Sequence, residues 1–156
     1  MSYLMQKRAF TIVELVFVIV IIGILAAVAI PKLNATRVDA KTSVLAQKII
    51  LSINEIKSHA LASGNLDNNI TAYSNMVNEM IAEGVAVLNH DGSQITIDTG
   101  SENSCLSLSL VGNNQELNLS VTMGQNISDD PICDGVQKLL GNQNYVMKIR
   151  GQLAKF

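Results

Sequence analysis

The chain has 156 residues, a formal net charge of −2 and 48% hydrophobic residues. A chain of this length has room for one modest domain and one further element, but not for two full domains. It has no basic surplus, and we therefore predict no nucleic-acid partner.

An apolar run over residues 9–31 dominates the N-terminal part of the sequence. It has no charged residue over 15–30, and it is apolar on every side of a helix, which suits lipid or the centre of a helical assembly. At about 1.5 Å of rise per residue, residues 10–30 can cross the roughly 30 Å hydrocarbon layer of a bilayer. We therefore predict a transmembrane or assembly helix over residues 10–31.

Glu14 is an acidic residue near the start of this run. A carboxylate costs about 2.5 kcal/mol or more at the centre of a bilayer, less near an end, and usually has a partner. Two interpretations remain open at this point. The carboxylate has a function, or it lies at the level of the lipid headgroups.

Two basic residues, Lys7 and Arg8, precede the apolar run as in a targeting leader. An ordinary secretory signal would be cut after Ala29, in the sequence Ala-Val-Ala, and would release a soluble periplasmic binding module. Three features speak against this alternative. They are Glu14 within the apolar region, the length of the run, and a helical pattern that continues past the cut.

The sequence K-R-A, then F-T-I-V-E-L, then an apolar run with Gly23 and Pro31 resembles the class III signal of type IV pilins and type II secretion pseudopilins. The resemblance is strong over about residues 7–33, holds for the rest of the helix by pattern, and holds for the remainder only in layout. The sequence departs from the family pattern at Ala9, where glycine is usual, and at residues 12–13, where Leu-Ile is usual.

The resemblance implies that a prepilin peptidase removes a leader, residues 1–9, by cutting between Ala9 and Phe10, and that the new amine of Phe10 is methylated. It implies an assembly role for Glu14, which would pair with the amine of a neighbouring Phe10. Gly23 and Pro31 would let the helix loosen during extraction from the membrane.

The resemblance also implies partners and a location. The partners are further copies of the chain, related pilins, the prepilin peptidase and an inner-membrane assembly platform. The protein would be a single-pass inner-membrane protein with its domain in the periplasm, and later a subunit of a pilus or pseudopilus. Pilus and pseudopilus remain alternatives, as do a major and a minor subunit.

Residues 32–63 are predicted to form the amphipathic half of the same helix, which would run to about Ser63. Its apolar residues step by seven or by three and four, which places them on one face. They are Val38, Leu45, Ile49, Ile53, Ile56 and Ala60. The pair Gly64-Asn65 is the predicted stop signal.

Residues 64–156 are predicted to form one globular α+β domain in the periplasm or outside the cell. A loop over 65–71 precedes a short helix around 76–81, and a second short helix is expected around 136–140. Apolar residues alternate with polar ones in the segments between and after them. We therefore expect an antiparallel sheet of four to five strands, laid against the long N-terminal helix. The apolar alternation includes Val85, Val87, Ile95, Ile97, Leu106, Leu108, Leu110, Leu117, Leu119, Val121 and Met123.

The two cysteines, Cys105 and Cys133, are most simply a disulfide in an extracytoplasmic domain, although two unpaired thiols are the alternative. A loop of 28 residues closed in this way would contribute roughly 3 to 4 kcal/mol in the chain-entropy model. The resemblance supports the pairing, because many type IV pilins have a cysteine pair around a C-terminal loop.

The sequence contains no pattern typical of an enzyme, and we predict no catalytic residue and no cofactor. Asp129, Asp130 and Asp134 are weak candidates for a calcium site, since carboxylates on a constrained loop can hold Ca²⁺. Some pseudopilins bind calcium in this region. The spacing matches no EF-hand loop, and solvated acidic residues are the more ordinary interpretation.

Overall fold

The computed structural model describes residues 10–63, 68–100, 104–112, 116–125 and 129–150. The chain divides between Arg37 and Val38 into two compact units, and each is described by itself. The predicted leader, residues 1–9, and the predicted stop signal at residues 64–65 lie outside the described residues.

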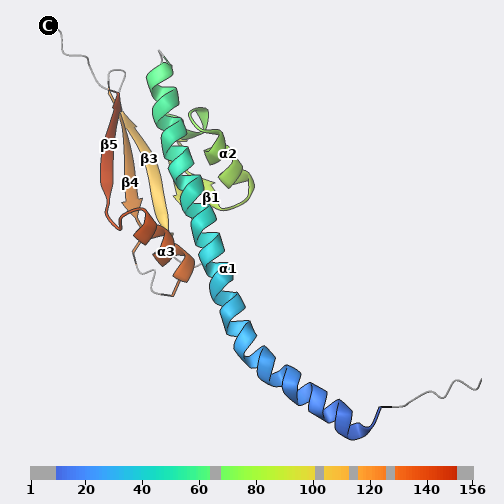
Figure 1. Ribbon diagram of the computed structural model, residues 1–156. Helices are drawn as coiled ribbons and strands as arrows, with labels where there is room; N and C mark the ends of the chain where they lie inside the picture. Colours follow the sequence, from blue (N-terminus) through green and yellow to red (C-terminus); the bar gives the residue numbers. More distant parts are fainter. Residues whose placement is uncertain (1–9, 64–67, 101–103, 113–115, 126–128, 151–156) are drawn as a thin grey trace, which may run out of the picture. The chain divides into compact units, whose positions relative to one another are not determined.

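Helix α1, Ile12–Ala62, confirms the predicted long helix and begins in the first unit (Figure 1). Every large apolar side chain from Ile12 to Leu33 is at least 42% exposed. The helix continues through Pro31, whose missing backbone donor leaves one helical hydrogen bond unmade. The first unit therefore contains a helix whose apolar surface the described residues of that unit leave uncovered.

In the second unit the same helix buries only one side. The buried residues recur every three or four positions, which confirms the predicted stripe, while Val38 at its start is half-buried. Burial of each large aliphatic side chain contributes about 1.5 to 3 kcal/mol, so this stripe attaches the helix to the rest of its unit. The buried set is Thr42, Leu45, Ala46, Ile49, Ser52, Ile53, Ile56 and Ala60.

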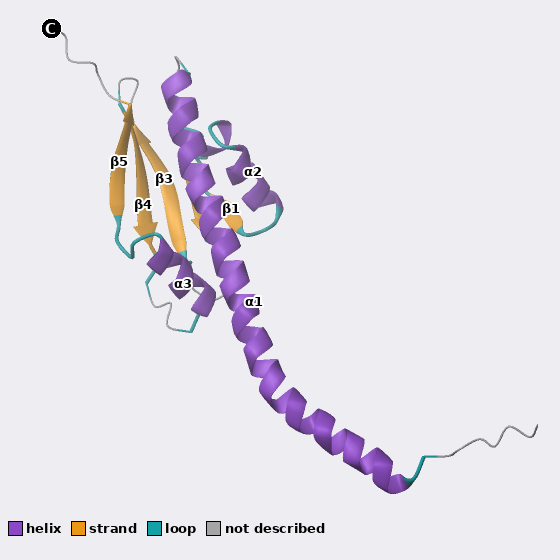
Figure 2. Cartoon of the chain, in the orientation of Figure 1, coloured by secondary structure: helices purple, strands orange, loops and turns teal. Residues whose placement is uncertain are grey.

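The rest of the second unit is built on one antiparallel sheet with the strand order β1-β2-β3-β4-β5 (Figure 2). Each strand pairs with the next along the chain, so short turns suffice for the connections. The fold is α+β with five strands, as predicted. The strands are β1 (Ala86–Leu88), β2 (Gln94–Ile97), β3 (Leu106–Gly112), β4 (Leu117–Met123) and β5 (Tyr145–Arg150).

One face of this sheet supplies half of the core. The buried strand residues alternate with polar ones, as predicted, and they join the α1 stripe in a single apolar cluster. The prediction for the first strand was wrong. Ala86 faces the core, whereas Val87 is 62% exposed and Val85 lies before the strand. A strand of three residues is too short for its pattern to fix which side faces inward.

Two short helical elements, the 3-10 turn η1 (Ile70–Ala72) and helix α2 (Asn75–Ala82), connect α1 to the sheet. Helix α2 confirms the predicted short helix. The turn η1 falls at the end of the predicted loop, where the Asn69 side chain accepts a hydrogen bond from the Thr71 N–H and so caps the turn.

Helix α1 holds the start of α2 through a carboxylate. Glu55 accepts hydrogen bonds from the Ser74 hydroxyl at 2.7 Å and from the Met76 N–H at 3.0 Å. These donors, with the Met76 N–H the larger influence, hold the pKa of Glu55 below its ordinary value of 4.5. The bonds stabilise the ionised carboxylate at the N-terminus of α2, where the helix dipole also favours negative charge.

Helix α3, Pro131–Leu139, begins earlier than predicted. Asp130 is its N-cap and Pro131 its first residue, an arrangement that suits proline because the first helical N–H has no partner in the helix. Asp130 and Asp134 therefore belong to the start of a helix and not to a loop. The calcium interpretation assumed carboxylates on a constrained loop, and two of the three candidates do not lie on one.

Candidate functional site

A reciprocal pair of side chains caps the start of α1. The Glu14 carboxylate accepts hydrogen bonds from the Thr11 N–H at 2.8 Å and from the Thr11 hydroxyl at 2.9 Å. The Glu14 N–H in turn donates to the Thr11 hydroxyl oxygen at 3.2 Å. This is a capping box, in which two residues three apart satisfy each other's free backbone donors.

The Glu14 carboxylate thus has hydrogen-bond donors within its own chain. Neither of the two interpretations of Glu14 from the sequence, a functional role or a position at the lipid headgroups, included such donors. Thr11 was missed as a member of the site. Its signal is present in the sequence, because Thr-x-x-Glu directly before an apolar helix is the pattern of a capping box.

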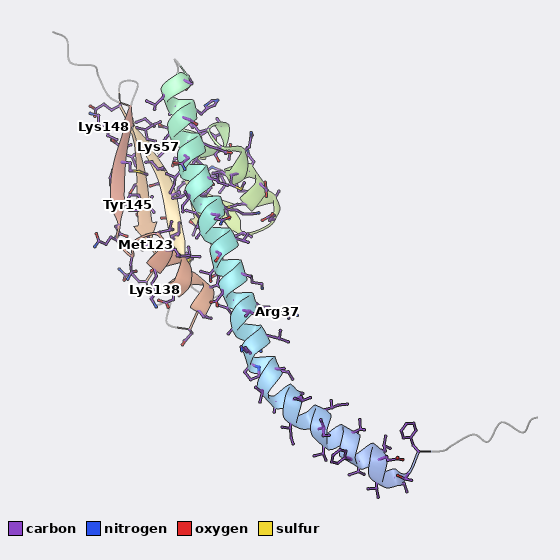
Figure 3. The ribbon with its side chains drawn as sticks, viewed as in Figure 1. Arg37, Lys57, Met123, Lys138, Tyr145 and Lys148 are labelled. Carbon is purple, nitrogen blue, oxygen red and sulfur yellow. A yellow bond between two sulfur atoms is a disulfide. The ribbon has the colours of Figure 1, made fainter. Side chains whose placement is uncertain are left out.

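The helix behind this cap is apolar all round. Figure 3 shows side chains extending from both edges of the first half of α1. The helix is long and apolar enough to cross a membrane, with a mean hydropathy of 3.1 over its most apolar window, and it lies near the N-terminus. A Cβ atom added at Gly23 would meet no atom of the described residues within 4 Å, apart from the adjoining backbone of its own helix. Both findings concern a helix surface that the described residues of its own unit leave exposed.

Comparison with protein families identifies this segment. Residues 4–30 match the family described as the prokaryotic N-terminal methylation motif. This motif is a class III signal of the kind that type IV pilins and pseudopilins carry. The search of curated proteins and the search of solved structures each found no match.

The class III signal supports processing like that of a prepilin. The predicted cut lies between Ala9 and Phe10. Ala9 is outside the described residues, and Phe10 stands directly before the capping box with 85% of its surface exposed. The proposed new N-terminus would therefore lie four residues from Glu14.

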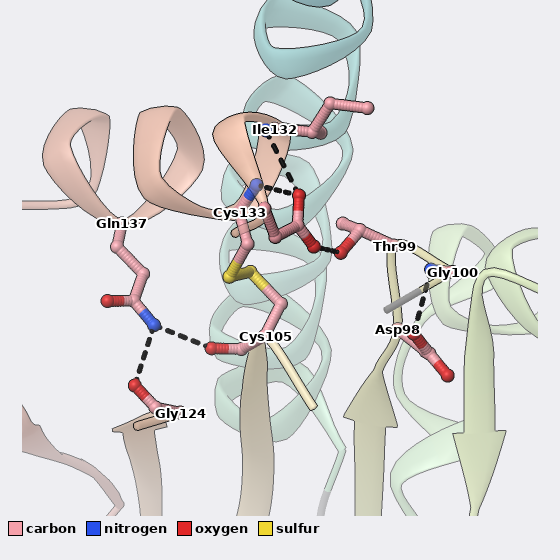
Figure 4. The surroundings of a disulfide bond; sticks show 9 residues. Asp98, Thr99, Gly100, Cys105, Gly124, Ile132, Cys133 and Gln137 are labelled. Carbon is pink, nitrogen blue, oxygen red and sulfur yellow. Dashed lines mark hydrogen bonds between the residues drawn. A yellow bond between two sulfur atoms is a disulfide. The ribbon is translucent and has the colours of Figure 1, made fainter. Parts of the chain in front are cut away.

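A disulfide joins Cys105 to Cys133, the pairing predicted from the sequence (Figure 4). Cys105 directly precedes β3 and Cys133 lies in the first turn of α3, and both are fully buried. The Gln137 amide, one turn later, donates to the Cys105 carbonyl at 2.7 Å and to the Gly124 carbonyl at 3.0 Å. Covalent and hydrogen bonds together fix α3 to the ends of β3 and β4.

The three acidic candidates are not brought together as a ligand set. Asp130 is 7% exposed and accepts hydrogen bonds from the N–H groups of Ile132 at 3.1 Å and Cys133 at 2.9 Å. Asp134 forms an ion pair with Lys138 at 2.6 Å, and Asp129 is exposed. In the ranges that the structure describes, no group of three histidine, cysteine or acidic residues is arranged to hold a metal ion.

Asp130 has a structural partner that the sequence did not indicate. Its second carboxylate oxygen accepts a hydrogen bond from the hydroxyl of Thr99, which lies in the connection after β2 (Figure 4). The contact joins residues 31 positions apart. Asp130 therefore serves both as the cap of α3 and as a link between α3 and the β2–β3 connection.

Proposed function

We propose that this protein is a structural subunit of a type IV pilus or of a type II secretion pseudopilus. It would be cut between Ala9 and Phe10 by a prepilin peptidase, methylated at Phe10, and assembled through residues 10–31. The observation that carries the proposal is the class III signal on a helix whose apolar side chains the described residues of its unit leave uncovered. The proposal assigns the protein no enzymatic activity.

The uncovered helix needs two environments in turn. Before assembly, lipid surrounds its apolar side chains, and the domain lies in the periplasm. After extraction by an inner-membrane platform, the same side chains pack against those of other copies and related pilins. Because the surface is apolar all round, it suits neighbours on every side.

Glu14 would supply the specific contact of this assembly. Its carboxylate, oriented by the two Thr11 donors, would form an ion pair with the positively charged amine of a neighbouring Phe10. In a filament core of low dielectric, an unpaired carboxylate would be costly, so the pairing favours one register between subunits.

Gly23 and Pro31 would make the helix easier to loosen during extraction. Glycine costs a helix about 1 kcal/mol relative to alanine, and proline removes a backbone donor. Each lies within the exposed part of α1, where packing by other described residues does not compensate.

The second unit fits a domain outside the cytoplasm. A structural disulfide persists in oxidising compartments such as the periplasm. The cysteine pair favours a pilus subunit over a pseudopilus subunit, since it resembles the pair of many type IV pilins. Electron microscopy of surface fibres on cells that express the protein distinguishes the two.

Replacement of Glu14 tests the proposal, provided that loss of charge is separated from loss of the cap. Glu14→Ala removes both. Glu14→Gln keeps a side-chain oxygen that can accept from the Thr11 N–H, as glutamine does in other capping boxes, but it cannot pair with an amine. We expect both variants to be processed and to remain in the membrane fraction, and to form few fibres by electron microscopy.

Normal fibres from Glu14→Gln would contradict the role of the charge. Normal fibres from both variants would remove Glu14 from the assembly mechanism altogether. A wild-type protein that forms no fibres when co-expressed with its own assembly machinery would contradict the proposed function itself.

A further inference from the structure

An open groove of about 660 Å³ lies within the second unit, along one side of α1. Its floor is apolar, with Val44 and Leu45 from α1, Val85 before β1 and Ile132 from α3. Val44 is 54% exposed, so the groove leaves apolar surface uncovered.

The charged residues of the groove differ in how they are used. Lys48 is bound to Glu83 at 2.6 Å and to Glu79 at 3.0 Å, and these carboxylates raise its pKa. Asp98, which lines the groove directly after β2, accepts a hydrogen bond from the Gly100 N–H at 2.8 Å. Lys41 is exposed, and its side chain has no hydrogen bond or ion pair with any residue that the structure describes. The groove therefore presents a cation, Lys41, that has no partner among the described residues.

An acidic residue of opposite charge to Lys41, Asp39, lies on the other side of α1. Asp39 is exposed and does not line the groove, and its carboxylate likewise has no partner among the described residues. Residues two apart on a helix point about 200° away from each other, so Asp39 and Lys41 of one chain do not face each other. A contact between these two side chains would therefore have to join two chains.

We infer that the groove is the docking site for α1 of a second copy of this chain, with Asp39 of that copy paired to Lys41. The inference rests on the proposed function, since it names one of the contacts through which the subunits would join. Ser43, one turn beyond Asp39 on the same side, has a small side chain that would allow close approach to the apolar floor.

The position of the two charges decides the kind of assembly. The surface that carries Lys41 differs from the surface that carries Asp39, so the contact is heterologous. A heterologous contact leaves one free surface of each kind at the ends of every assembly, and it continues into a ring or an open helical polymer. A closed dimer would need a surface that matches itself, and this pair of residues does not provide one.

Charge reversal tests the pairing. Lys41→Asp and Asp39→Lys each place like charges at every contact, which costs several kcal/mol, so we expect the assembled fraction to fall about tenfold or more. The double variant Lys41→Asp with Asp39→Lys restores opposite charges, and we expect it to recover fibres. Lys57→Asp is the matched control, because Lys57 is an exposed lysine of α1 outside the groove.

The full-length chain is used throughout, with electron microscopy for fibres and intact mass for processing. Single variants that assemble like the wild type overturn the inference while the proposed function stands. A double variant that stays defective, or a Lys57→Asp control that fails equally, also overturns it. Absence of fibres from the wild type would contradict the proposed function instead.

Cysteine cross-linking measures the geometry directly. The two native cysteines are bonded to each other, so they leave the introduced thiols without a competing partner. The double variant Asp39→Cys with Lys41→Cys, oxidised in assembled material, should give a ladder of dimers, trimers and longer species on a non-reducing gel. Each single variant should give dimers at most. A double variant that stops at dimers contradicts a heterologous contact.

Discussion

The two parts of α1 have similar secondary structure and opposite surroundings. Ile19, before the division of the chain, is 57% exposed, whereas Ile49, after it, is fully buried. The same residue type thus serves two purposes in one helix. In the second unit it stabilises the fold, whereas in the first unit it lies on a helix surface that the described residues of that unit leave exposed. Hydrophobicity alone does not separate these roles, but the sidedness of the pattern does.

Matched isoleucine replacements should separate the two roles most strongly. Ile49→Ala removes fully buried atoms and should destabilise the domain by about 3 to 4 kcal/mol. Ile19→Ala should leave domain stability unchanged and should reduce fibre yield. Urea unfolding of the full chain in detergent, followed by protease susceptibility, measures stability. Equal stability losses from the two variants would contradict the contrast.

The disulfide should matter for the second unit alone. Replacing both cysteines by alanine should lower the free energy of unfolding of the domain by about 3 kcal/mol, as expected for opening a loop of 28 residues. Membrane insertion of the first unit should be unaffected. The same urea titration, with and without reductant on the wild type, checks the size of the effect. An unchanged midpoint would show that Gln137 and the core hold α3 without the covalent bond.

Glu55 should give a smaller effect that depends on pH. Glu55→Gln removes a charge-assisted cap of α2 and should cost about 1.5 to 2 kcal/mol at neutral pH. Because the folded pKa lies below the ordinary 4.5, the contribution is complete above about pH 4.5 and is lost as the pH falls through the folded value. The difference between wild type and variant should therefore shrink in acid. A constant difference from pH 7 to pH 3 would contradict this account.

Much of the fold follows from local patterns in the sequence. The stripe on α1, the short helix α2 and the long strands β3 and β4 were predicted because each spans enough residues for its period to be unambiguous. The inward side of β1 was not predictable, since three residues carry too little pattern. The earlier start of α3 had a usable signal in Asp130 followed by Pro131, which is typical of a helix N-terminus.

The site was predictable to a different degree. The class III signal needs only consecutive residues, so the sequence alone indicated it. Local sequence patterns do not predict contacts between residues far apart in the chain. Examples are the hydrogen bond of Thr99 with Asp130 and the two hydrogen bonds of the Gln137 amide. The groove beside Lys41 is formed by several separate segments and is visible only in three dimensions.

The central claim is that the first unit is a processed assembly helix, and the intact mass of the protein isolated from its native membrane tests it most directly. The account predicts the mass of residues 10–156 plus one methyl group, with the disulfide intact, in the membrane fraction or in fibres. A soluble protein that begins at Ile30, as an ordinary secretory signal would give, or an uncut chain that begins at Met1 would contradict it.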